Sequence, residues 1–254
     1  MIRKKRLNRL GTGLFTFISI FYVLPVVVVL FNSFKKKSYI NLEPFKLPNE
    51  TTFTGLDNYA TAINQYDFLK AVGWTVFITV GSVLVILICT SMCAWFITRV
   101  RTRVTKAIYI LCVFSMVVPF QMVMFTLSLV TDRLGLGTPW GLIIIYLGFG
   151  AGLAVFMFCG FVKSIPIEIE EAAMIDGCSP IRTFFSVVLP IMKPTYISVG
   201  ILETMWIWND FLLPYLTLDI KKYKTISIVI QYMKGSYGRV DMGAIMAALI
   251  MAVI

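Results

Sequence analysis

Long apolar runs alternate with short polar segments along the chain. A helix that crosses the hydrocarbon core of a bilayer needs about 20 apolar residues, because each residue advances the helix by about 1.5 Å and the core is about 30 Å thick. The runs that reach this length are Leu10 to Phe31, Val72 to Thr98, Ala107 to Val130, Trp140 to Val162, and Thr195 to Leu218. We expect each of these runs to form a transmembrane helix.

A further apolar run begins near Met242 and reaches the last residue, Ile254. As a helix it would advance only about 20 Å, which is short of the far side of the bilayer. We expect this run to be the sixth transmembrane helix and to continue beyond Ile254 in the native protein. The pattern thus predicts an all-α integral membrane protein with six transmembrane helices, in which residues 1–254 form a single domain.

The composition agrees with a chain that faces lipid. Hydrophobic residues make up 58% of the sequence and charged residues 14%, and the mean hydropathy is +0.84, which exceeds that of an ordinary soluble domain. A net charge of +10 can indicate nucleic acid, but here Lys and Arg flank the apolar runs instead of gathering on a polar domain. Nucleic acid is therefore excluded as a partner, and a lipid membrane is expected.

The positive charges predict which side of the membrane each end faces, because cytoplasmic segments next to transmembrane helices are enriched in Lys and Arg. One dense group precedes the first run and a second follows the second run: Arg3, Lys4, Lys5, Arg6 and Arg9, then Arg99, Arg101, Arg103 and Lys106. We expect both groups to lie in the cytoplasm. The loop between the fourth and fifth runs then lies on the same side.

Residue types that enzymes and metal sites need are missing or dispersed. The sequence contains no histidine, which removes the commonest general base and metal ligand. The cysteines form no pair with metal-binding spacing, and the phosphate-binding motif G-x-x-x-x-G-K-S/T does not occur. We expect no catalytic residue, no metal, no cofactor and no ATPase site in this chain.

The long polar segment on the predicted cytoplasmic side is Lys163 to Pro194. Acidic residues crowd the start of a first short helix, and Gly177 stands where that helix would end. Ser179 and Pro180 predict the start of a second helix. Its apolar residues recur at α-helical spacing on one stripe: Ile181, Phe184, Phe185, Val188 and Leu189.

A cytoplasmic protein partner is the better interpretation of this pair of helices. A helix that merely rests on an anionic lipid leaflet is rich in Lys and Arg, whereas the first helix here carries Glu168, Glu170 and Glu171. Apolar and acidic side chains together favour docking on another protein.

The segment resembles the EAA loop of the permease subunits of ATP-binding-cassette (ABC) importers. Both the order and the spacing of Glu-Ala-Ala at 171–173, Gly177 and Leu-Pro at 189–190 match that loop. The stretches VVPFQMVMF, LGLGTPWGLII and WNDFLLPYLTL are similar to the sugar-uptake branch of the family, so the likeness covers nearly the whole chain. Cys178 departs from the family, which most often has alanine there.

The resemblance implies a type I ABC importer fold and a permease subunit for a sugar or oligosaccharide in the bacterial plasma membrane. The EAA loop, residues 163–194, would dock on cytoplasmic ATP-binding subunits that supply the energy. The likeness assigns this docking to Glu170, Glu171, Ala172, Ala173, Asp176, Gly177, Phe184, Leu189 and Pro190. A second, non-identical permease is expected beside this chain, and an extracellular solute-binding protein is expected to contact the outer segment Asp219 to Asp241, including Tyr237.

Polar residues inside the apolar runs are candidates for the path of the solute. Glu203, Trp206, Asn209 and Asp210 recur on one side of the fifth helix, and an aromatic ring beside carboxylate and amide groups suits a sugar. Gln121 in the third run is a further candidate. Because such residues also hold membrane helices together, both interpretations stay open.

Two other functions also stay open. A permease for amino acids or another small polar solute would carry the same kind of loop. A self-sufficient secondary carrier would need its own ion relay or filter loop, and the sequence contains neither a ladder of charges nor a filter-like segment.

Overall fold

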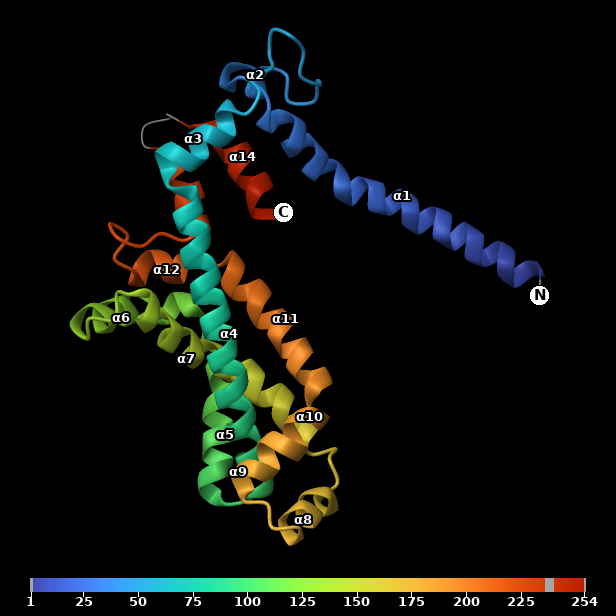
Figure 1. Ribbon diagram of the computed structural model, residues 1–254, viewed down its shortest axis with the longest axis vertical. Helices are drawn as coiled ribbons and strands as arrows, with labels where there is room; N and C mark the ends of the chain where they lie inside the picture. Colours follow the sequence, from blue (N-terminus) through green and yellow to red (C-terminus); the bar gives the residue numbers. More distant parts are fainter. Residues whose placement is uncertain (1, 236–239, 254) are drawn as a thin grey trace. The chain divides into compact units, whose positions relative to one another are not determined.

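The computed structural model describes the backbone of residues 2–235 and 240–253 and the side chains from residue 11 onward. These residues form helices, and among them the extended backbone pairs only at an isolated bridge between Lys35 and Phe53. Two compact units are present, Met1–Val72 with Ile226–Ile254, and Gly73–Thr225. The long helix α4 (Phe68–Arg99) begins in the first unit and continues through the second (Figure 1).

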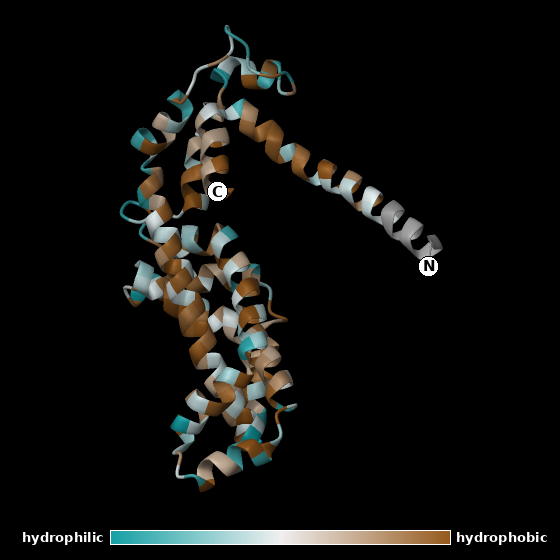
Figure 2. Ribbon diagram, turned by 45° about the vertical axis from the view of Figure 1, so that its right-hand side comes forward, coloured by the Kyte–Doolittle hydropathy of each residue, from teal (hydrophilic) through white to brown (hydrophobic). Residues whose placement is uncertain are grey.

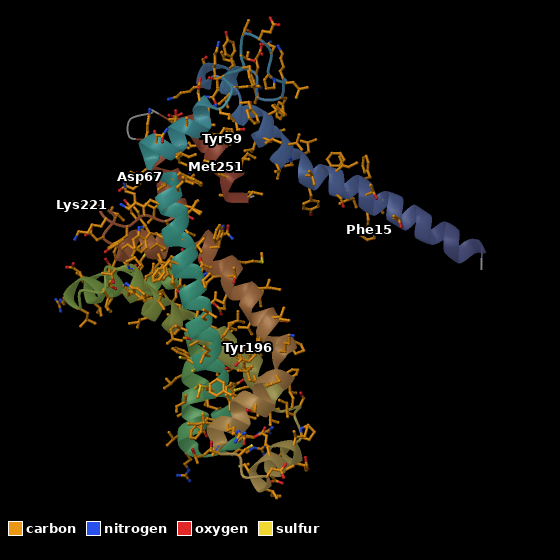
Figure 3. All side chains as sticks on the ribbon, in the orientation of Figure 1. Phe15, Tyr59, Asp67, Tyr196, Lys221 and Met251 are labelled. Carbon is orange, nitrogen blue, oxygen red and sulfur yellow. The ribbon has the colours of Figure 1, made fainter. Side chains whose placement is uncertain are left out.

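The first unit brings the two ends of the sequence together. Its helices are α1 (Ile2–Ser33), α2 (Lys37–Leu42), α3 (Asp57–Tyr66), α13 (Ile226–Met233) and α14 (Met242–Val253). α14 packs against α1 and α3. Much of α1 is uncovered: its most apolar window is 0% buried, and Phe15 projects from it with 71% of its surface exposed (Figure 3).

The polar segment that follows α1 is held in a defined conformation around Lys35. The Lys35 side chain is 1% exposed, and its Nζ donates to the Glu43 carbonyl oxygen at 2.8 Å. Burial lowers the pKa of the Lys35 ammonium, and the Glu43 carboxylate partly opposes this effect. Asn58 of α3 donates from Nδ2 to the carbonyl oxygens of Ser33 and Lys35, which ties α3 to the end of α1.

The second unit contains the main hydrophobic core. Its further helices are α5 (Arg103–Ser115), α6 (Phe120–Arg133), α7 (Pro139–Val162), α8 (Ile167–Ile175), α9 (Pro180–Thr183), the π-helical turn η1 (Phe184–Val188), α10 (Leu189–Ile191), α11 (Lys193–Asn209) and α12 (Leu212–Thr217). Ile86 of α4, Phe158 of α7 and Val199 of α11 are fully buried in this core. Hydrophobic residues concentrate along the helices, and hydrophilic residues gather in the loops (Figure 2).

Three of the predicted spans appear as continuous helices. Among the described residues, the Gly11–Ser33 part of α1, α4 and α7 are each long and apolar enough to cross a bilayer alone. They agree with the first, second and fourth predicted runs. α14 is a shorter apolar helix, so its passage through the whole membrane stays a prediction.

The expectation of one continuous helix over the third run is wrong. α5 ends at Ser115 and α6 begins at Phe120, and the two helices are bent by 104°. Pro119 explains the break, because proline has no N–H to donate and disfavours helical angles at the residue before it.

The expectation of one continuous helix over Thr195–Leu218 is wrong as well. α11 ends at Asn209 and α12 begins at Leu212. At the break the Asp210 carboxylate accepts hydrogen bonds from the N–H groups of Leu212 at 3.0 Å and Leu213 at 3.5 Å. This side chain therefore satisfies the first two N–H groups of α12, which gives the backbone an alternative to continuing α11.

Close packing between α5 and α7 depends on Gly152. A Cβ there would lie 2.7 Å from both the Cys112 carbonyl oxygen and Ser115 Oγ, whereas a Cβ at Gly148 on the same helix would meet nothing within 4 Å. We expect Gly152→Ala to lower the free energy of unfolding by about 1–3 kcal/mol, because the helices must separate. Gly148→Ala should leave it unchanged or raise it slightly. Thermal unfolding of both purified variants measures the difference, and equal midpoints would contradict this packing.

Candidate functional site

The first half of the 163–194 loop is the short helix α8, which ends in a left-handed glycine as the sequence predicts. Gly177 has a φ of +86°. Its N–H donates to the Met174 carbonyl oxygen, and the Cys178 N–H donates to the Ala173 carbonyl oxygen, both at 3.0 Å. These bonds close the end of the helix and turn the chain toward the second half of the loop. A Cβ at Gly177 would meet no atom within 4 Å, so only the backbone conformation requires glycine.

The second half of the loop differs from the single apolar stripe that the sequence predicts. α9 starts where expected, with Ser179 Oγ accepting a hydrogen bond from the Arg182 N–H at 3.4 Å, but a π-helical turn follows at η1. The wider turn changes which side chains share a face. Phe184 and Val188 are fully buried in the core, whereas Ile181 is 65% and Phe185 45% exposed. The stripe is thus divided between the core and the surface.

The turn between α8 and α9 presents an exposed face. Among the residues that the likeness assigns to docking, Glu171, Ala172, Asp176 and Gly177 are exposed and Ala173 is half-buried. Uncovered apolar side chains stand among them, with Ile175 exposed at 85%. An exposed apolar patch rimmed by charged groups is typical of a protein interface. The loop motif alone did not single out Met174 and Ile175, although apolar residues in a polar loop are a signal in the sequence.

Glu170 is placed differently from its neighbour Glu171. It is 2% exposed and turned toward α4. Its Oε1 accepts hydrogen bonds from Arg99 Nη2 at 2.6 Å and Arg99 Nε at 3.0 Å, and its Oε2 accepts one from Trp95 Nε1 at 2.9 Å. Arg99 Nη2 also donates to the Ile165 carbonyl oxygen at 2.9 Å. This buried ion pair fastens α8 to the end of α4.

Phe184 provides a second attachment between the loop and α4. Its ring is fully buried and its centre lies 5.4 Å from that of Trp95. The sequence pointed to Glu170 and Phe184 as docking residues but not to their partners Trp95 and Arg99. Leu189 is half-buried and Pro190 exposed, at the step from η1 into α10.

The candidate residues for the solute path, at the end of α11 and just after it, have different surroundings. Asp210 accepts a hydrogen bond from Tyr146 Oη at 3.0 Å, and the Tyr146 ring packs edge-on against Trp206 with centres 5.4 Å apart. Asn209 is exposed and donates from Nδ2 to the Met205 carbonyl oxygen at 2.7 Å. The sequence did not single out Tyr146, which joins Asp210 to Trp206. Gln121 is exposed in the first turn of α6, and no described contact joins it to this group.

Glu203 lies beside a small cavity within the membrane region of the second unit. The side chain is 2% exposed, and its Oε2 has no hydrogen-bond partner among the described residues. Gly150 of α7 makes room for it, because a Cβ there would lie 2.9 Å from Glu203 Oε2. Glu203, Gly150 and Trp206 are among the residues that line a cavity of about 220 Å³. A buried polar group without a partner is a candidate for binding a polar ligand.

The loop and the membrane helices match known transport proteins. The family model described as the inner membrane component of binding-protein-dependent transport systems matches residues 86–254. A probable starch degradation products transport system permease protein of Thermoanaerobacterium thermosulfurigenes is 37% identical over 93% of this chain and 84% of its own length. The multiple sugar-binding transport system permease protein of Streptococcus mutans is 35% identical over 79% of this chain and 72% of its own length.

A solved structure has the same fold. It is a bacterial ABC transporter involved in the import of the acidic polysaccharide alginate, and one of its chains superposes with a TM-score of 0.77 at 18% identity. The superposition covers 98% of this chain and 92% of that chain. Together with the matched family model, it shows that this multi-pass membrane protein has the type I permease fold and belongs to the family of inner membrane components of binding-protein-dependent transport systems.

Proposed function

We propose that this chain is a membrane-spanning permease subunit of an ATP-driven importer for a sugar or oligosaccharide, in the bacterial plasma membrane. The 163–194 loop is the observation that carries the proposal. Its turn offers exposed apolar and acidic side chains, while Glu170 and Phe184 fasten it to α4. When a partner docked on such a surface moves, the surface can transmit the movement to a membrane helix. The transport roles of the starch-product and multiple-sugar relatives favour a sugar as the solute.

The energy comes from cytoplasmic ATP-binding subunits in this proposal. Closure of two such subunits around ATP would move the exposed turn, and the ion pair between Glu170 and Arg99 would carry the movement into α4. The helices would then rock between inward and outward openings.

Two further partners complete the proposed assembly. A second permease, different from this one, would cover part of the apolar surface, and the uncovered window of α1 is available for such a contact. A solute-binding protein would deliver the sugar from outside. A transporter of the same fold has been solved with an alginate pentasaccharide-bound periplasmic protein. The segment expected to receive this protein includes Tyr237, which lies outside the described residues.

Purification of the complex from the native membrane, followed by ATPase assays with candidate solutes, tests the proposal. We expect ATP-binding subunits and a second permease to copurify, and we expect one sugar with its binding protein to stimulate hydrolysis. Stimulation of ATP hydrolysis by an amino acid alone would show that the transported solute is another small polar molecule and not a sugar. Transport by the isolated chain without ATP would identify a secondary carrier and contradict the proposal.

We also propose that Glu203 and Trp206 line the path of the solute, with Asp210 and Tyr146 holding the Trp206 ring. Trp206→Ala should reduce sugar uptake at least tenfold, because stacking of a ring on a sugar face would be lost. Trp140→Ala is a matched control, since Trp140 is 67% exposed on α7 and packs edge-on against Phe77 instead. Uptake and ATP hydrolysis are measured in proteoliposomes for both variants. Equal uptake would leave Trp206 with a packing role only.

A further inference from the structure

Three exposed cations without an anionic partner among the described residues line one small cavity in the second unit. Arg101, Lys106 and Lys163 line a cavity of about 250 Å³ together with Thr98 and Tyr109. None of the three cations forms a salt bridge with another described residue, and the described lining contains no Asp or Glu. Like charges that face one space without a counter-ion repel one another, so the cavity favours an anion.

A larger cavity with mostly apolar walls, which also include Ser164, Thr195 and Ser198, adjoins the basic one. It has a volume of about 560 Å³ and shares Tyr109 and Lys163 with the first cavity. Its walls include Phe156, Met157 and Phe161 of α7. At the junction Lys163 Nζ lies 5.8 Å from the centre of the Tyr109 ring. The two cavities together offer a basic site that continues into an apolar trough.

The position of this pair of cavities along the membrane helices indicates what could occupy it. Arg101 lies two residues past the end of α4, and Lys163 follows the last residue of α7. Both helices are long and apolar enough to cross a bilayer, so their ends lie at the level of the lipid headgroups. A ligand there needs an anionic head and an apolar tail.

We propose that the two cavities bind one anionic phospholipid, with its phosphate among Arg101, Lys106 and Lys163 and an acyl chain along the apolar trough. Basic pockets between membrane helices on the cytoplasmic side are known to take such headgroups. General enrichment of positive charge at this boundary does not explain the arrangement, because Arg103 at the start of α5 lines neither cavity. The lipid site requires only that the chain lies in a membrane. Its test therefore does not depend on whether the chain is a subunit of a sugar importer.

The lipid that stays bound during purification tests the charged part of the site. The full chain is purified with its partners in mild detergent, and retained phosphatidylglycerol is counted by native mass spectrometry. Each cation near an anionic headgroup strengthens binding about fivefold, so Lys106→Gln alone should weaken retention about fivefold. A variant with all three cations replaced by glutamine should lose the lipid. Arg103→Gln is the matched control and should retain it. Equal retention by the control and the triple variant would overturn the proposal.

A second set of variants distinguishes a lipid from a free anion. Gly160 lines the apolar cavity and a Cβ there would meet nothing within 4 Å. Gly160→Leu should therefore fill the trough and expel an acyl chain without touching the cations. Delipidated protein is titrated with phosphatidylglycerol, phosphatidylcholine or inorganic phosphate, and the thermal midpoint is recorded. We expect only phosphatidylglycerol to raise the midpoint, and Gly160→Leu to abolish that rise. An equal rise with phosphatidylcholine or with phosphate alone would overturn the lipid assignment.

Discussion

Arg99→Gln is expected to release the 163–194 loop from α4 and to uncouple ATP hydrolysis from uptake. The substitution leaves the Glu170 carboxylate 2% exposed with the Trp95 indole as its remaining side-chain donor. Removing one partner of a buried ion pair costs about 3–5 kcal/mol. Local opening of the loop should therefore rise by at least about 100-fold. Tryptic cleavage after Arg182, which is exposed in the loop, reports this opening in the assembled complex.

The double variant Arg99→Gln/Glu170→Gln separates the ion pair from a general loss of folding. It removes both charges and still leaves an amide oxygen that can accept from Trp95, so it should slow tryptic cleavage again and recover part of the uptake. Arg103→Gln, which removes the same charge at an exposed position at the start of α5, should behave as the unmodified protein. A normal cleavage rate in Arg99→Gln would show that the pair does not hold the loop.

The elements that the sequence predicted well depend on local or one-dimensional signals. The apolar length of α4 and α7 reflects the thickness of the bilayer, which is independent of tertiary contacts. Gly177 was predictable because a helix end in the left-handed conformation strongly favours glycine. The order of residues from Glu171 to Pro190 pointed to the permease family before any geometry was known, and the family match confirms that family.

The elements that the sequence missed depend on contacts between distant segments or on local competition for the backbone. The mean hydropathy of a long window is hardly changed by the single residue Pro119. The apolar pattern therefore predicted one helix where α5 and α6 are bent by 104°. The sequence left open whether Asp210 faces the solute or holds helices together, and only the fold shows that its carboxylate accepts from the Leu212 N–H and from Tyr146. Glu170 and Glu171 are adjacent in the sequence, and only the fold shows that one pairs with Arg99 while the other is exposed.

Gly177→Asp is expected to abolish uptake while leaving this chain folded. Within the chain the cost is conformational, because the φ of +86° disfavours any side chain by about 1–2 kcal/mol while the added Cβ meets no neighbour. The larger effect arises at the proposed partner surface. There a new carboxylate would follow Asp176 directly and would have to lose its water when the ATP-binding subunit docks. Copurification of that subunit and uptake in proteoliposomes are the two measurements.

Gly177→Asn separates the effect of a side chain at this backbone conformation from the effect of an added negative charge. Asparagine has nearly the size of aspartate and adopts the left-handed conformation more readily than most residues, but it adds no charge. If charge at a docking surface matters, Gly177→Asn should retain uptake within about fivefold of the unmodified protein, while Gly177→Asp should lose at least tenfold more. Equal loss in both variants would assign the defect to the turn itself. Normal uptake in both would mean that this turn does not meet the ATP-binding subunit. The coupling role would then have to pass to Ile181, Phe185 and Ile191, which are exposed large apolar residues of the second half of the loop.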